Sequence, residues 1–286
     1  MYGFGFQYGK ISGGSVASFF LDTYTGAAAA YSLQKIKATT TNVIKARRSS
    51  DDAELDFTAA EITDGTLTTW TGAGDGFVTI WYDQSEDNHI INATSGEQPK
   101  IVDSGSVVLE NGKPALDFGG SSELNKATVS ISSNDYSFFG VANTSGNGTK
   151  ALFRNRELGT FGSFEGAGFL ELNDSNIQNT FIDDGSGNAL QASSNSLTYS
   201  QQIITTLYTL STAALYSNGS QIGSSNQGSG STPLTGPIAL PYLNVGGKIF
   251  SRPWQSTVQE IILYNSNQTA NKAGIESNIN GRYTIY

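Results

Sequence analysis

The stretch that decides the fold is Gly74-Asp75-Gly76-Phe77-Val78-Thr79-Ile80-Trp81-Tyr82-Asp83-Gln84-Ser85. A Gly-Asp-Gly turn leads into a run of strand-forming residues, and the run ends in a polar cluster that continues to Asn88. Turn residues at both ends of an apolar run frame a β-strand. Apolar residues occupy both alternating positions, so we expect a central strand that is covered on both faces.

Beyond this strand, the chain contains many short apolar runs separated by Gly, Asn and Ser, which is typical of antiparallel sheets. Asn111-Gly112 and Asn218-Gly219 are two-residue hairpin signals. The run from Thr257 to Tyr264 predicts the clearest strand of the chain. We therefore predict an all-β fold, a jelly-roll β-sandwich.

Two short helices are predicted at the ends of the sandwich. Residues 26–37 are rich in alanine, carry apolar residues at helical spacing and end in lysines, which favours a short amphipathic helix. Residues 271–280 favour a second one, and residues 54–73 predict a loop or short helix. The sandwich domain is expected over residues 21–286.

Residues 1–20 are predicted to be an N-terminal arm. Its alternating aromatic residues precede a Gly/Ser joint, and we expect them to pack against a partner chain as an oligomerisation arm, with a homotrimer favoured: Tyr2, Phe4, Phe6 and Tyr8. An ordinary first strand is the alternative interpretation.

The composition excludes several classes of function. A formal net charge of −9 disfavours nucleic acid or an anionic membrane as partner, and no apolar run is long enough to span a bilayer. Cysteine is absent, which removes disulfides and thiolate metal sites, and no His/Glu metal motif is present. We expect no cofactor and no metal. The N-terminus lacks the features of a signal peptide, while the hydroxyl- and amide-rich composition suits an exterior surface. A virion protein folded in the host cytoplasm satisfies both expectations.

Residues 136–286 resemble the concanavalin A-like lectin/glucanase (laminin-G-like) sandwich. The resemblance is carried, in order, by Tyr136-Ser-Phe-Phe-Gly-Val-Ala, Leu215-Tyr-Ser-Asn-Gly, Leu243-Asn-Val-Gly-Gly and Val258-Gln-Glu-Ile-Ile-Leu-Tyr-Asn. It implies a lectin-like β-sandwich.

Residues 27–118 resemble the N-terminal portion of arabinofuranosidase B-type catalytic domains. The carrying residues are Ala30-Tyr-Ser-Leu, Arg47-Arg-Ser-Ser-Asp and Trp81-Tyr-Asp-Gln-Ser. Modules of this combined type also occur in bacteriophage tail and spike proteins. The resemblance implies a pair of catalytic carboxylates and a vicinal disulfide, but a chain without cysteine cannot form that disulfide.

Retaining glycoside hydrolysis needs two carboxyl groups about 5 Å apart. No motif of the resemblance places either of them in the second half of the chain, and we therefore predict no catalytic residue. The local candidates are Glu157, Glu165, Glu171 and Asp174.

Carbohydrate binding is expected from loops that combine planar polar side chains with aromatic rings. Arg154-Asn155-Arg156 and Arg252-Pro253-Trp254-Gln255 have that composition, with packing at the sandwich edge as the alternative for Trp254. After the opening strand, Asp83 is expected to accept sugar hydroxyls, to ligate calcium or to cap a turn. The predicted binding residues are Asp83, Gln84, Asn88, Arg154, Arg156 and Trp254.

Asp183-Asp184-Gly185-Ser186-Gly187-Asn188 contains calcium-ligand types without the EF-hand spacing, and a solvated turn is expected there. His89, the single histidine, is expected to be a loop or core residue.

The sequence predicts a virion surface protein, a spike or tail component, whose lectin-like domain binds a host-surface glycan or docks on other virion proteins. The alternatives are a glycoside hydrolase acting on arabinose-containing or related polysaccharide, and a purely structural assembly module.

Overall fold

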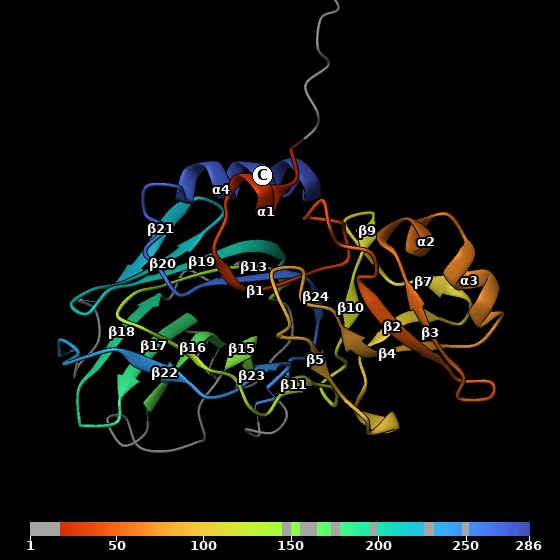
Figure 1. Ribbon diagram of the computed structural model, residues 1–286, viewed down its shortest axis with the longest axis horizontal. Coiled ribbons are helices and arrows are strands. Elements are labelled where there is room, and N and C mark those ends of the chain that lie inside the picture. The colour runs from red at the N-terminus through yellow and green to blue at the C-terminus, as the bar shows by residue number, and fades with distance from the viewer. Residues whose placement is uncertain are drawn as a thin grey trace, which may run out of the picture.

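The computed structural model describes residues 18–144, 150–154, 165–172, 178–194, 199–225, 232–247 and 252–286 (Figure 1). In this part of the chain, a 20-stranded sheet folds over on itself to form two layers, and every strand pairing in it is antiparallel. The predicted all-β sandwich is confirmed. The predicted arm with Tyr2, Phe4, Phe6 and Tyr8 lies outside the described residues.

The front layer runs in the spatial order β3 (Glu54–Phe57), β2 (Ile44–Arg48), β4 (Gly76–Trp81), β5 (Ile90–Ile91), β11 (Leu124–Lys126), β23 (Leu243–Val245), β15 (Phe153–Arg154), β16 (Glu165–Leu172), β17 (Gln178–Asp184) and β18 (Ala189–Ser194). The back layer runs in the order β1 (Ala27–Ser32), β24 (Thr257–Tyr264), β13 (Tyr136–Asn143), β19 (Gln201–Tyr208), β20 (Ala213–Ser217) and β21 (Ser220–Ser224).

Short strands complete the sheet at its edges. They are β6 (Lys100–Asp103), β7 (Ser106–Val107), β10 (Leu116–Asp117) and β14 (Lys150–Ala151). Because β10 pairs with both β6 and β24, it joins the two layers. Two further strand pairs stand apart, β8 (Leu109–Glu110) with β9 (Lys113–Pro114), and β12 (Ile131–Ser133) with β22 (Ile238–Leu240).

The main hydrophobic core fills the space between the two layers. It contains Trp81 from the front layer and Phe138 from the back layer. A second apolar cluster lies on the other side of the back layer, where Phe139 and Ile262 pack against Ile275. Ile275 belongs to the C-terminal helix α4 (Lys272–Tyr283), which covers that face together with α1 (Phe20–Thr23), as Figure 1 shows. The short C-terminal helix is therefore confirmed.

The predicted helix over residues 26–37 is wrong. Residues 27–32 form strand β1, which pairs with β24 along its length. Its side chains alternate between the two apolar clusters, with Ala29 and Tyr31 in one and Ala27 and Ala30 in the other. Pairing with a central strand and burial on both faces outweigh the high helix propensity of alanine, because a local preference of a few tenths of a kcal/mol per residue yields to tertiary contacts.

The other predicted elements agree with the structure in part. The segment 54–73, predicted as a loop or short helix, does contain two short helices, α2 (Ala59–Thr63) and α3 (Thr66–Thr71), but its first residues form strand β3, which was not predicted. Both Asn-Gly hairpins form, between β8 and β9 and between β20 and β21. In the opening strand β4, however, Phe77 and Ile80 are only half-buried, so one face packs in the core and the other does not. In the described part of the chain, no helix is long and apolar enough to cross a membrane.

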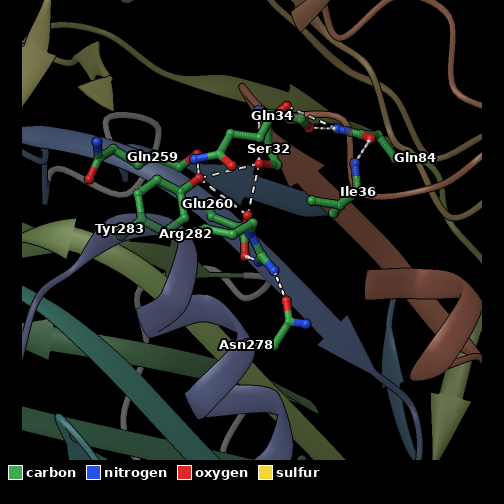
Figure 2. Close-up of polar contacts among 9 residues, drawn as sticks. All are labelled: Ser32, Gln34, Ile36, Gln84, Gln259, Glu260, Asn278, Arg282 and Tyr283. Carbon is green, nitrogen blue, oxygen red and sulfur yellow. Dashed lines mark hydrogen bonds and ion pairs between the residues drawn. The ribbon is translucent and has the colours of Figure 1, made fainter. Parts of the chain in front are cut away.

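A buried polar network fastens α4 to the back layer (Figure 2). Ser32 of β1 donates from Oγ to the Glu260 carboxylate of β24 at 2.8 Å, and Tyr283 of α4 donates to the same oxygen at 3.2 Å. Arg282 of α4 forms an ion pair with the other Glu260 oxygen. Burial, and after it the charge of Glu260, raises the pKa of the Tyr283 phenol well above its usual range, so this hydroxyl stays a hydrogen-bond donor.

Candidate functional site

A continuous row of paired residues crosses the front layer. The cross-strand pairs run from Asn125 of β11 to Asn244 of β23, from Asn244 to Arg154 of β15, and from Arg154 to Gly168 of β16. Gly168 is paired in turn with Phe181 of β17. Directly paired residues of neighbouring strands place their side chains on the same face of a sheet. These residues therefore share one face.

That face points away from the hydrophobic core. The neighbouring residues along the same strands, Leu124, Val245 and Phe153, all belong to the core between the layers. Because successive side chains of a strand point to opposite faces, Asn125, Asn244 and Arg154 lie on the other face. We call it the outer face of the front layer.

Two carboxylates and two guanidinium groups lie on the outer face. Glu171 of β16 lies 3.3 Å from Arg154 Nη1 and 3.6 Å from Arg252 Nη1. Asn244 Nδ2 donates to Glu123 Oε2 at 3.0 Å. Glu123 precedes Asn125 by two residues and so shares its face. These five residues are called the outer-face cluster: Glu123, Arg154, Glu171, Asn244 and Arg252.

Four of the five residues of the outer-face cluster are almost excluded from solvent, although they lie on the side opposite the core, and Arg252 is half-buried. Arg154 is 3% exposed, Glu123 6%, Glu171 7% and Asn244 1%. Withdrawing paired charges from water is costly and does little for stability compared with apolar packing, so such clusters are common where a protein needs charge for function.

Gly168 makes room for the Glu171 carboxylate. A Cβ atom at this position would lie 3.0 Å from Glu171 Oε1 and 2.3 Å from a ring carbon of Phe181. The guanidinium carbon of Arg154 in turn lies 5.7 Å from the centre of the Phe181 ring, within cation–π range. The absence of a side chain at Gly168 thus allows the aromatic ring, the guanidinium and the carboxylate to pack together.

Two groups near the outer-face cluster carry shifted pKa values. Burial, and to a smaller extent the charge of Glu171, raises the pKa of the Tyr208 phenol well above its usual range, although its hydrogen bond with Thr180 works in the opposite direction. Burial lowers the pKa of the Lys150 ammonium to about 8. The Lys150 side chain donates to the Thr144 carbonyl at 3.2 Å and lies 5.3 Å from the centre of the Trp254 ring.

Asp83 caps a turn, which is one of the roles predicted for it. Its carboxylate accepts five hydrogen bonds at 2.7–3.3 Å: from the backbone N–H groups of Ala30, Ser85, Glu86 and Asn88 and from the Ser85 hydroxyl. The Asp83 N–H donates to His89 Nδ1 at 3.0 Å. These contacts hold the loop between β4 and β5 in one conformation.

The Gln84 and Asn88 side chains are also engaged within this loop. Gln84 donates from Nε2 to the carbonyls of Ser32 and Gln34 and accepts from the Ile36 N–H, as Figure 2 shows. Asn88 donates from Nδ2 to the Ala28 carbonyl at 2.9 Å. Both side chains therefore attach the loop to β1 and the segment that follows it.

The predicted binding residues Arg154, Arg156 and Trp254 do not lie together in one site. Arg154 lies in the outer-face cluster, whereas Arg156 lies outside the described residues, as do Glu157 and Asp174. Trp254 is fully buried and belongs to the core between the layers, which is the packing role that the sequence left as an alternative.

The described residues contain no group of three or more His, Cys, Asp or Glu side chains that could hold a metal ion. At the end of β17, Asp183 and Asp184 use their carboxylate oxygens for hydrogen bonds within the turn that follows. Asp184 accepts hydrogen bonds from the backbone of Ser186 and from the backbone and side chain of Asn188, and Asp183 accepts from the Gly185 N–H. Their oxygens thus hold the turn in place.

Sequence reasoning missed Glu123 and Asn244. Each stands next to a core residue of a short strand, and the apolar–polar alternation alone could have placed them on an outer face. What it could not supply is the register that brings β11, β23 and β15 together.

Comparison with known proteins identifies the fold of the chain and does not assign it to a family. No protein-family model and no curated protein matches the chain. Among solved structures, a "GH54 a-l-arabinofuranosidase soaked with cyclic sulfate inhibitor" is similar with a TM-score of 0.62 and 16% identity. An arabinofuranosidase "complexed with arabinofuranosyl-alpha-1,2-xylobiose" gives a TM-score of 0.62 and 17% identity.

Both alignments cover 88% of this chain and 62% of the arabinofuranosidase, so the chain spans less than two thirds of those proteins. A Trypanosoma rangeli sialidase gives a TM-score of 0.44 at 15% identity, over 70% of this chain and 30% of the sialidase. The chain therefore shares the fold of arabinofuranosidase structures, which agrees with the likeness read from its first half.

Proposed function

We propose that the protein is a glycoside hydrolase acting on an arabinose-containing or related polysaccharide, with its site at the outer-face cluster. The single observation that supports this most is that two nearly solvent-excluded carboxylates, Glu171 and Glu123, lie on the sheet face opposite the core. The shared fold of the arabinofuranosidase structures is consistent with it.

Glycoside hydrolysis by direct attack of water needs one carboxylate that is charged at the start and accepts the proton of the water, and one carboxyl group that delivers a proton. The two guanidinium groups beside Glu171 favour its charged form. The Asn244 amide donates a hydrogen bond to Glu123. We assign Glu171 as the charged group and Glu123 as the proton donor.

In the proposed reaction, the bond between the anomeric carbon and the glycosidic oxygen breaks. Glu123 gives its proton to the departing oxygen, and a water molecule bonds to the anomeric carbon and releases a proton to Glu171. Positive charge that develops on the sugar ring is stabilised by the Glu171 carboxylate. Proton exchange with solvent then restores both carboxyl groups.

Arg252 supports the same location for the ligand. Its Nε atom is buried, and no described residue accepts a hydrogen bond from it. Buried polar atoms usually have a partner, so a sugar hydroxyl is a suitable acceptor for this donor.

The test is sugar release from arabinan and related polysaccharides by the full chain and three variants. Glu171→Gln and Glu123→Gln are expected to lower the rate at least 100-fold. Glu54→Gln, at an exposed carboxylate of β3, is the matched control and is expected to release sugar at the wild-type rate. Release that is unchanged in Glu171→Gln would rule out the proposed site.

Glycan binding without hydrolysis is the second candidate. It is favoured by the planar polar row of Asn125, Asn244 and Arg154, because side chains of this kind can bind sugar hydroxyls without performing any reaction. Binding that survives in a chain that releases no sugar would select it. Attachment to a host surface as a virion component, and a trimer formed through the arm, stay predictions from the sequence.

A further inference from the structure

The outer face continues well beyond the outer-face cluster. Asn125 is paired with Ile91 of β5, Ile91 with Ile80 of β4, and Ile80 with Lys45 of β2. The row that contains Arg154 and Asn244 therefore extends without a break to Lys45 of β2, the neighbour of the edge strand β3. Figure 1 shows the strands that the row crosses. From Arg154 to Ile80 it crosses four inter-strand steps of about 4.8 Å, a length of about 19 Å.

Burial changes sharply along this row. Asn244 and Arg154 are buried, Asn125 and Ile80 are half-buried, and Ile91 is 48% exposed. Solvent-exposed sheet faces usually carry polar side chains, so two adjacent isoleucines on this face form an unusual apolar strip. An apolar strip beside a buried polar site offers a contact surface for the apolar side of a ligand.

A polar groove adjoins the strip at its far end. The Tyr82 and His89 rings meet edge to face, with 5.0 Å between their centres, and both residues line a groove of about 430 Å³. Tyr82 follows Ile80 by two residues and His89 precedes Ile91 by two, so both belong to the same face. The rest of the groove is lined mainly by hydroxyl, amide and carboxylate side chains, including Thr39, Thr40, Thr41, Asn42, Glu86 and Asp87.

The groove has a firm scaffold. Tyr82 donates its hydroxyl hydrogen to Asp56 Oδ1 at 2.6 Å, and the His89 ring accepts the hydrogen bond from the Asp83 N–H. The Asp83 carboxylate in turn fixes the backbone of the whole loop. A preformed groove of this kind lowers the entropy cost of binding.

We propose that a neutral polysaccharide chain lies across the strands of the outer face, from the outer-face cluster over Ile91 and Ile80 to the groove beside Tyr82 and His89. The inference rests on the proposed function in that carbohydrate is the ligand, and it defines the substrate as a polymer of several sugar units. Ile91 and Ile80 contact the apolar C–H faces of the sugars, and the groove binds their hydroxyl groups.

A neutral chain fits the charges along this track. Lys45, at the end of the row, lies 3.9 Å from Asp56, and the groove contains Glu86 and Asp87 as well as Lys37. With a formal net charge of −9, the protein also has no overall attraction for a polyanion. An acidic polysaccharide is therefore the less suitable ligand.

The test measures dissociation constants for arabinose oligosaccharides of increasing length and for a panel of neutral polysaccharides that begins with linear arabinan. Glu171→Gln serves as the background, so that no chain is cut. Affinity is expected to rise at least tenfold between the shortest and the longest chains. Ile91→Glu and the milder Ile91→Ser are both expected to abolish most of that rise. Leu109→Glu is the matched control, because Leu109 is 55% exposed on the separate β8–β9 hairpin.

Melting temperatures of the variants check that each is folded. A length dependence that persists in both Ile91 variants would overturn the inference, as would equal affinity for short and long chains or no binding to any member of the panel. This result is independent of hydrolysis. Length-dependent binding by a wild-type chain that releases no sugar would uphold the track and refute the proposed hydrolase, whereas sugar release without length dependence would do the reverse.

Discussion

The Asp83 side chain stabilises the loop between β4 and β5 through its hydrogen bonds. Its carboxylate is buried and satisfies four backbone N–H groups, among them that of Ala30 in β1. Asp83→Ala leaves several of these donors without a partner and is expected to lower the free energy of unfolding by about 3 kcal/mol. Urea unfolding measures this. Asp87→Ala, at an exposed residue of the same loop, is the control and should change stability by less than about 0.5 kcal/mol.

Lys150 makes stability depend on pH in the alkaline range. Burial lowers the pKa of its ammonium from 10.5 to about 8 in the folded chain. Between these two values the unfolded chain binds more protons than the folded chain, so this group makes stability rise with pH there. Below pH 8, the charged ammonium therefore destabilises the fold.

Lys150→Met is therefore expected to be more stable than the wild type at pH 7, and its advantage should shrink as the pH rises from 8 towards 10. Urea unfolding of both proteins at pH 7, 8, 9 and 10 measures the difference, which removes the effects of groups that both proteins share. A difference that does not change with pH would contradict the assignment.

Among the elements, α4 is attached to β24 in part by a buried ion pair. Glu260 of β24 is fully buried, and Arg282 of α4 neutralises its charge (Figure 2). Arg282→Met leaves the carboxylate without its cation and is expected to cost about 3–5 kcal/mol of stability. The double variant Arg282→Met/Glu260→Gln should cost less than the sum of the two single variants.

The exposed pair of Arg48 and Asp51 provides a comparison for this cycle. Its two residues should couple much more weakly than Arg282 and Glu260, because solvent screens them. Additive effects of the Arg282 and Glu260 substitutions would show that the ion pair does not fasten α4.

An element could be predicted from the sequence when neighbouring residues determine it, and not when pairing with a distant segment determines it. The β20–β21 hairpin was predictable because Asn218-Gly219 specifies the turn by itself, and Asn218 adopts the positive φ that such a turn needs. Strand β1 was not, because its conformation comes from pairing with β24, far away in the sequence. The outer-face cluster was only partly predictable for the same reason. Arg154, Arg252 and Glu171 attracted notice as residue types, but only the sheet register shows that they meet.

The molecule as a whole is built around β24, which pairs with β1, β10 and β13. The core between the layers contains residues from Ala29 to Leu263, so both halves of the chain share it. We expect residues 18–286 to unfold in one cooperative transition, with equal calorimetric and van't Hoff enthalpies. Two separate transitions would mean that the two resemblances found in the sequence correspond to independent units.

The central claim is that the outer-face cluster holds a carbohydrate, and a crystal structure of Glu171→Gln soaked with an arabinose oligosaccharide tests it most directly. The account predicts sugar bound on the outer face of the front layer, within hydrogen-bond distance of Arg154, Asn244 and Arg252. Sugar bound only elsewhere on the molecule, with the outer-face cluster unchanged, would contradict it.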